Sequence, residues 1–306
     1  MKNKNVGFII STVAFCFVAV AAIPLRTYQL FTNIEPDTGF FINGTDMLVY
    51  LLYAILAAGI VISVFSSVLY KNELGYDRAV MKRPVQGVIS LITGFTMLFD
   101  MARVLVTLLN GWNGAGITPV DKVLNSAMVL FGILSAIFFV VFAISMFSGA
   151  TNASEYKLLS LAIPVWFVVR LVSRFTTKIS FVRVSELTIE IFMLVFMLLF
   201  FLSFAQLNSK IESKGIDWKI VGYGIPAAVL ALVCFIPRII VAVTGNADLI
   251  YQNVKIEYCD AGCALFTLSV VFSRIGWTGG NADSKDEAAE AVSAPTAAET
   301  AESAEK

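Results

Sequence analysis

Eight apolar segments, each close to the length needed to cross a lipid bilayer, occupy most of the 306 residues. They cover residues 6–23, 47–70, 88–109, 127–149, 158–175, 187–206, 220–243 and 261–275. A spanning helix needs about 20 apolar residues, because about 1.5 Å per residue must cover about 30 Å of hydrocarbon. Lipid offers no hydrogen-bond partners to the backbone, so these segments are predicted to be helices. We therefore expect an all-α, polytopic membrane helix bundle with about eight transmembrane helices arranged as four helical hairpins.

The overall composition supports this class and excludes others. Hydrophobic residues make up 58% of the chain and charged residues 14%, which is far from the balance of a soluble domain. The formal net charge is zero, which argues against a nucleic-acid partner. The expected surroundings are the lipid bilayer of a cell membrane, specifically a bacterial plasma membrane.

Three of the segments have an alternative interpretation. The fifth and eighth are short and carry Arg170 and Arg274, so they are the weakest spans. The first follows Lys2 and Lys4 and ends in small residues, as a cleaved secretory signal would. We favour a retained first helix, because its apolar stretch is long for a signal and further spans follow it.

Basic residues are unequally divided between the two sides of the predicted membrane. With the N-terminus in the cytoplasm, thirteen lie on the inner side: Lys2, Lys4, Lys71, Arg78, Lys82, Arg83, Lys157, Lys210, Lys214, Lys219, Arg274, Lys285 and Lys306. Six lie on the outer side: Arg26, Lys122, Arg174, Lys178, Arg183 and Lys255. Because cytoplasmic loops carry the excess of Lys and Arg, both termini are predicted to be cytoplasmic.

The composition changes abruptly after Trp277. Residues 1–277 form the predicted transmembrane domain, whereas residues 278–306 are rich in Ala, Glu, Ser and Thr and contain almost nothing apolar. Such a segment buries too little surface to offset the entropy of ordering. It is predicted to be a disordered, acidic cytoplasmic tail.

A weak internal repeat runs through the four hairpins. Each outward helix has an arginine near its outer end, and each inward helix starts with a capping or acidic residue. The arginines are Arg26, Arg103, Arg170 and Arg238, and the starting residues are Asp46, Ser126, Glu186 and Asp260. Four such helices would gather positive charge on the outer side of the bundle.

Charged pairs in the third hairpin predict an ion ladder. Arg170 and Arg174 are four residues apart and share a helix face, as do Glu186 and Glu190 on the next helix. A turn near Ser180 places Arg174 opposite Glu186 and Arg170 opposite Glu190. Charges in lipid are tolerated mainly when they are paired, so a structural role is favoured over a ligand site.

Asp100 lies near the middle of the third span, with Arg103 one turn away on the same face. A charge at this depth costs about 3 kcal/mol on insertion scales. Folding the hairpin places only Gly132 and Ser135 opposite, which cannot neutralise it. A structural Asp–Arg pair and a ligand-linked carboxylate are equally consistent with this pattern.

The residues that several kinds of catalytic and metal-binding site require are absent from the sequence. The sequence contains no histidine, which excludes His-activated nucleophiles and imidazole metal sites. Cys16, Cys234, Cys259 and Cys263 do not form the paired spacing of a structural metal site, and no phosphate-binding glycine loop precedes a helix. The chain is therefore not expected to be an enzyme, and no cofactor or metal is implied.

Two functions remain. The first is binding or transport of a small anionic ligand through an outward-facing, arginine-lined vestibule with Asp100 at its floor. The second is a non-transporting membrane sensor or subunit that docks a partner membrane protein. The candidate ligand-binding residues are Asp100, Arg103, Arg170, Glu190 and Arg238.

Overall fold

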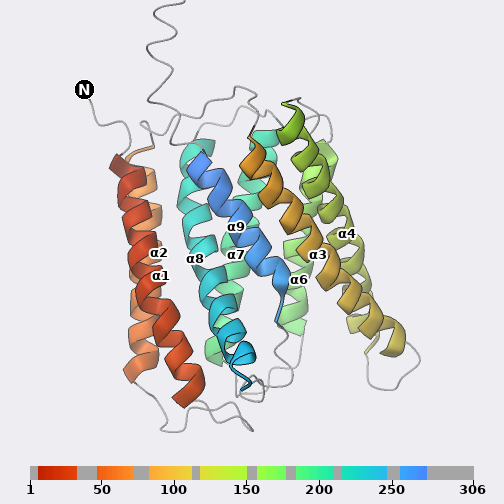
Figure 1. Cartoon of the computed structure of the whole chain (residues 1–306), viewed down its shortest axis with the longest axis horizontal. Helices are drawn as coiled ribbons and strands as arrows, with labels where there is room; N and C mark the ends of the chain where they lie inside the picture. The colour runs from red at the N-terminus through yellow and green to blue at the C-terminus, as the bar shows by residue number, and fades with distance from the viewer. Residues whose placement is uncertain are drawn as a thin grey trace, which may run out of the picture.

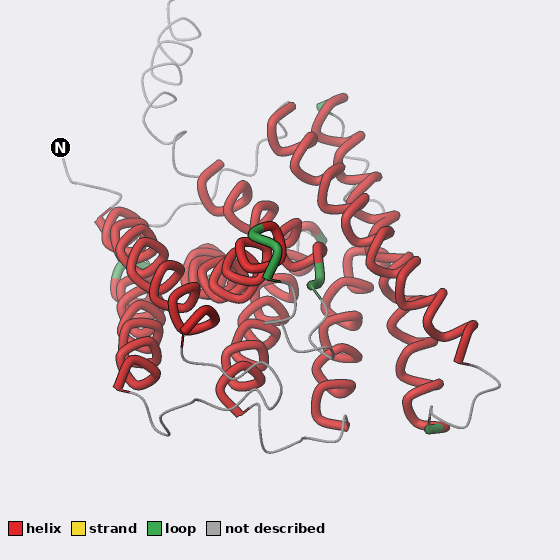
Figure 2. The backbone as a smooth tube through the Cα atoms, turned by 60° about the horizontal axis from the view of Figure 1, so that its bottom comes forward, coloured by secondary structure: helices red, strands yellow, loops and turns green. Residues whose placement is uncertain are grey.

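The computed structural model describes residues 6–32, 47–71, 83–111, 118–149, 157–176, 184–209, 215–246 and 256–273. Its elements are α1 (Val6–Thr32), α2 (Met47–Leu69), α3 (Pro84–Gly111), α4 (Pro119–Ser148), α6 (Lys157–Thr176), α7 (Val184–Asn208), α8 (Ile216–Val243) and α9 (Tyr258–Ser273). Within these ranges the chain is helical with short loop segments and no strand, as Figure 2 shows. The predicted tail, residues 278–306, lies outside the described residues, as does Asp46.

Seven of the helices, all except α9, are long and apolar enough to cross a membrane. The all-α, multi-pass bundle predicted from the sequence is therefore confirmed. The eighth helix differs from the others because α9 has only 16 residues, which at about 1.5 Å per residue is about 24 Å. In Figure 1, α9 begins above the lower ends of α3 and α8, so its N-terminus lies inside the bundle.

The four predicted hairpins are present, because α1 contacts α2, α3 contacts α4, α6 contacts α7 and α8 contacts α9. Helix α8 is the centre of the bundle and packs against α1, α2, α7 and α9. In an apolar stretch of 18 residues within α8, 67% of the residues are buried, which is more than in the corresponding stretch of any other spanning helix. Figures 1 and 2 show the α1–α2 and α3–α4 hairpins on opposite flanks, with the other helices between them.

Several helices extend beyond the apolar segments that predict them. Helix α1 continues through Pro24 and the buried Arg26 to Thr32. Helix α4 begins at Pro119, where the Thr118 hydroxyl accepts a hydrogen bond from the Asp121 N–H. The prediction that Ser126 caps this helix is therefore wrong, because Ser126 lies inside it and donates to the Lys122 carbonyl at 2.8 Å. Polar residues extend a helix wherever their side chains can satisfy its backbone groups.

Helix α9 approaches α3 closely at Gly262. The Thr93 hydroxyl donates to the Gly262 carbonyl at 2.9 Å. A Cβ atom added at Gly262 would lie 2.4 Å from the Thr96 hydroxyl and 3.1 Å from the backbone Cα of Thr93. Glycine at this position therefore sets how closely the two helices pack.

Replacing Gly262 by alanine should lower the free energy of unfolding by about 1–3 kcal/mol, because the Thr93 backbone cannot move aside easily. Thermal unfolding of the detergent-solubilised protein measures this effect. Gly87→Ala is the matched control, since the added methyl meets only the half-exposed Phe147 ring. Equal melting temperatures for the two variants would contradict the close α3–α9 approach.

Candidate functional site

Charged side chains from five helices and the residues preceding α9 gather around the N-terminus of α9. At their centre the Arg170 guanidinium, on α6, is 2% exposed. It donates two hydrogen bonds to the Asp260 carboxylate, from Nη1 to Oδ1 at 2.5 Å and from Nη2 to Oδ2 at 2.8 Å. It also forms an ion pair with Glu257. Such two-pronged bonds between a guanidinium and a carboxylate are among the strongest polar contacts in proteins.

The next turn of α6 continues this network. Arg174 contacts Glu190 of α7 at 2.6 Å and Glu257 at 3.1 Å. Arg170 lies 3.9 Å from the same Glu190 carboxylate. Arg238 of α8 also interacts electrostatically with Glu190. One acid of α7 is therefore shared by three arginines.

Asp100 binds the start of α9 directly. Its Oδ2 accepts a hydrogen bond from the Cys259 backbone N–H at 2.7 Å. The first N–H groups of a helix have no partner within the helix, and its N-terminus attracts negative charge. Asp100 is itself buried, and its Oδ1 lies 3.4 Å from Arg103. The carboxylate thus caps a helix that is distant in sequence.

Arg103 differs from Arg170 because its side chain is 42% exposed. Its Nη1 donates to the Ile256 carbonyl at 2.8 Å and lies beside Asp100. The guanidinium also lies over the rings of Phe99 and Tyr258, 5.9 and 5.8 Å from their centroids. Among the described residues, the Nε and Nη2 groups of Arg103 donate to no acceptor.

A cavity of about 90 Å³ lies beside these residues, between α3, α4, α6 and the start of α9. We call it the charged cavity. Its lining is Asp100, Met101, Arg103, Val104, Thr107, Met128, Trp166, Arg170, Glu257 and Cys259. Trp166 is 1% exposed, and its indole Nε1 has no hydrogen-bond partner in the described part of the chain. The Nε1 atom is covered by α4 at Gly132, so the cavity is lined by other atoms of the Trp166 side chain.

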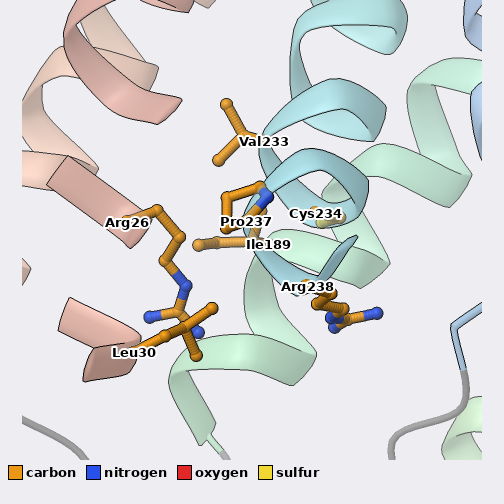
Figure 3. A pocket seen from close by; sticks show the side chains of 7 residues that line it. All are labelled: Arg26, Leu30, Ile189, Val233, Cys234, Pro237 and Arg238. Atoms are coloured by element: carbon orange, nitrogen blue, oxygen red, sulfur yellow. The ribbon is translucent and has the colours of Figure 1, made fainter. Parts of the chain in front are cut away.

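A second, much smaller cavity of about 10 Å³ lies between α1, α7 and α8. Figure 3 shows Arg26 of α1 reaching into it, whereas Arg238 of α8 points away from Arg26. Arg26 donates to Gln29 at 3.2 Å, and Gln29 donates to the Leu48 carbonyl of α2 at 2.9 Å. This space accommodates about one water molecule. The arginines of the predicted repeat therefore do not line one common vestibule.

Glu257, Cys259 and Asp260 offer possible metal-ligand atoms within 4.8 Å of one another. The guanidinium of Arg170 already pairs with both carboxylates. We assign no ion to this set, because a cation there would compete with a buried arginine for the same oxygens.

The structure brings most of the predicted site residues together. Asp100, Arg103 and Arg170 line the charged cavity, and Glu190 and Arg238 lie in the adjoining ion network. The predicted Arg170–Glu190 pair is within ion-pair distance, although Arg174 lies closer to Glu190. The side chain of Glu186, the other predicted partner, is outside the described residues.

Three participants were missed in the sequence: Glu257, the Cys259 backbone N–H and Trp166. Asp260 was expected to cap α9, but its carboxylate binds Arg170 instead. Two acids three residues apart at the start of a helix, matching Arg170 and Arg174 four apart on another, are the signal that could have revealed this pairing.

The arginines and acids of the site are equal in number. Arg103, Arg170, Arg174 and Arg238 are matched by Asp100, Glu190, Glu257 and Asp260.

No family model, curated protein or solved structure matches the chain. Any activity must therefore be argued from this geometry.

The bidentate pair predicts a hierarchy of coupling energies. Arg170→Leu should destabilise the protein by about 3–5 kcal/mol, because it leaves buried acids without their cation. In double-mutant cycles, Arg170 should couple more strongly to Asp260→Asn than to Glu190→Gln, since only Asp260 receives two hydrogen bonds from it. Equal couplings, measured by thermal unfolding, would refute the assignment of Asp260 as the principal partner.

Capping of α9 predicts different effects for two substitutions of Asp100. Asp100→Asn keeps an oxygen that can accept from the Cys259 N–H, whereas Asp100→Ala removes it. The alanine variant should be less stable than the asparagine variant by about 1 kcal/mol, the usual contribution of a helix cap. Thermal unfolding of both variants measures the difference. Equal stability would show that the bond to α9 contributes nothing.

Proposed function

We propose that this multi-pass membrane protein binds a small anionic ligand in the charged cavity. The observation that carries the proposal is the unused edge of Arg103, a residue that lines this cavity and is partly exposed. The Nε and Nη2 groups of this edge donate to nothing in the described ranges. A ligand with acceptor oxygens or a halide would satisfy these donors.

The hydrogen-bonding capacity of the cavity favours an anion although its charges balance. Both oxygens of Asp100 have partners, in Arg103 and in the Cys259 N–H. The two oxygens of Glu257 face Arg174 and Arg170. The acids are therefore paired with cations of the protein, although Glu257 Oε2 accepts no hydrogen bond, whereas the exposed edge of Arg103 has no acid of its own among the described residues. Because Arg103 is the most exposed arginine of the network, it is best placed to receive a ligand from outside.

A binding role is supported over a catalytic one, because the sequence has no histidine and the thiol of Cys259, in the cavity lining, is buried beside an Asp260 carboxylate that already binds Arg170. We propose in addition that the charged cavity faces the cell exterior, with both termini cytoplasmic, from the bias of basic residues. We also propose that the protein transports the bound ligand across the membrane. The competing function, a sensor or subunit that docks a partner membrane protein, requires no response to small anions.

Thermal unfolding in detergent with a panel of sodium salts at constant ionic strength tests the proposal. A ligand present at about 100 times its Kd should stabilise the protein by about 2.7 kcal/mol. Arg103→Gln should weaken binding by about 10- to 100-fold, the effect of losing a hydrogen bond to a charged group.

Arg83→Gln is the matched control, since Arg83 does not line the charged cavity. It should retain the response to the active salt. If no anion stabilises the wild type, or if the control loses the response equally, the binding proposal is refuted and the docking function gains support.

A further inference from the structure

We infer that the anion bound at the charged cavity is the phosphate of an anionic phospholipid, which reaches Arg103 from the bilayer beside α3. This inference rests on the proposed function and adds the source and the chemical class of the ligand. Three features support it: the exposure of Arg103 at the edge of the cavity, the apolar side chains around it, and its depth along α3.

The charged cavity reaches the surface of the bundle at Arg103. This residue lines the cavity, and 42% of its side chain is exposed. Its Nη1 is taken by the Ile256 carbonyl and Asp100, and the guanidinium lies over the rings of Phe99 and Tyr258. These contacts hold the guanidinium in place and leave its Nε and Nη2 groups without an acceptor among the described residues. A ligand at the surface of the bundle can therefore bind the guanidinium.

The side chains exposed around Arg103 are mostly apolar. Phe99, one turn before it in α3, is 55% exposed, and Val106, one turn after it, is 56% exposed. Tyr258 at the start of α9 is 37% exposed. The Thr107 hydroxyl is used within the helix, because it donates to the Arg103 carbonyl at 2.9 Å. Helix α3 belongs to a hairpin on the flank of the bundle (Figure 1), so this apolar surface faces lipid chains.

The position of Arg103 along α3 is close to the level of lipid headgroups. Helix α3 has 28 residues and is about 42 Å long, whereas the hydrocarbon layer is about 30 Å thick. With α3 centred in that layer, each end extends about 6 Å beyond it. Arg103 precedes the last residue, Gly111, by eight positions, or about 12 Å, so its Cα lies about 6 Å inside the hydrocarbon. A charge at this depth draws headgroups toward it, because the bilayer thins locally around it.

A dissolved anion is less suited to this position than a lipid phosphate. It would lose its water on entering the apolar surroundings of Arg103. A lipid phosphate already lies at the edge of the hydrocarbon, and the acyl chains of the same molecule pack against the exposed side chains of Phe99 and Val106. The phosphate oxygens accept hydrogen bonds from the free Nε and Nη2 groups.

The charges of the site favour a lipid with a net negative charge. The acids that line the cavity are already paired, Asp100 with Arg103 and the start of α9, and Glu257 with Arg170. The cation of a zwitterionic headgroup would therefore find no acid of its own in the described lining. An anionic headgroup brings no such cation and pairs with Arg103 alone.

The experiment separates a lipid phosphate from a dissolved one. Thermal shift of the full chain in detergent gives the Kd of dioleoyl phosphatidylglycerol, of phosphatidylcholine with the same acyl chains, and of glycerol phosphate. We expect the anionic lipid to bind at least about tenfold more tightly than either of the others. Phosphatidylcholine lacks the net charge, and glycerol phosphate lacks the acyl chains.

Substitutions of Arg103 show whether the preference arises at this site. Arg103→Gln should abolish the preference for phosphatidylglycerol over phosphatidylcholine. Arg103→Lys keeps a charge beside Asp100 and so preserves the fold, but it loses the free guanidinium edge and should weaken binding of the anionic lipid about tenfold. Lys122→Gln in α4 is the matched control, because it removes one charge from the same hairpin and Lys122 does not line the cavity. It should keep the full preference.

The outcomes distinguish failure of this inference from failure of the proposed function. Glycerol phosphate that binds through Arg103 as tightly as the anionic lipid would overturn the lipid source and leave the anion site intact. Equal affinity for the two lipids in the wild type, or equal losses in Arg103→Gln and Lys122→Gln, would overturn the assignment of an anionic lipid to this arginine. The absence of a response to every anion, dissolved or lipid, would refute the proposed function itself.

Discussion

The buried guanidinium of Arg170 is the charge around which the rest of the site is arranged. A cation removed from water is stable only when acids and hydrogen bonds replace the lost solvation. Asp260, Glu257 and Glu190 supply these partners from α9, from the residue before α9 and from α7. Since Glu190 in turn pairs with Arg174 and interacts with Arg238, the one buried cation joins α6, α7, α8 and α9.

The short length of α9 explains why these charges lie within the bundle. A helix of 16 residues cannot reach both ends of neighbours of 28 residues, so its N-terminus falls among their side chains. Unpaired N–H groups at that depth require acceptors that solvent cannot provide. Asp100 provides one of them from α3, which gives a buried acid a structural reason to lie in the middle of an apolar helix. Asp100 has two roles that are compatible. Its carboxylate caps α9, and the same residue lines the charged cavity.

The charged cavity follows from the same arrangement. The space lies between α3, α4 and α6 beside the first turn of α9, where Cys259 forms part of its lining. Trp166 and Arg103 line this space, while the acids nearby are held by Arg170, Arg174 and the start of α9. The site therefore combines overall neutrality with an arginine edge that no described residue occupies.

The sequence by itself determined the class of the protein, the positions of its helices and the fact that its intramembrane charges require partners. Hydrophobic length fixes spanning helices, and spacings such as Arg170 with Arg174 fix which side chains share a face, because both depend only on local geometry. Only the tertiary structure decided the pairing of Arg170 with Asp260, 90 residues away in the chain, and the meeting of Asp100 with the start of α9. Folding each hairpin back on itself finds partners within that hairpin, whereas α9 contacts α3 through the packing of the whole bundle. Which residues of distant segments become partners depends on how the helices pack, and this packing cannot be read from the local periodicity of the sequence.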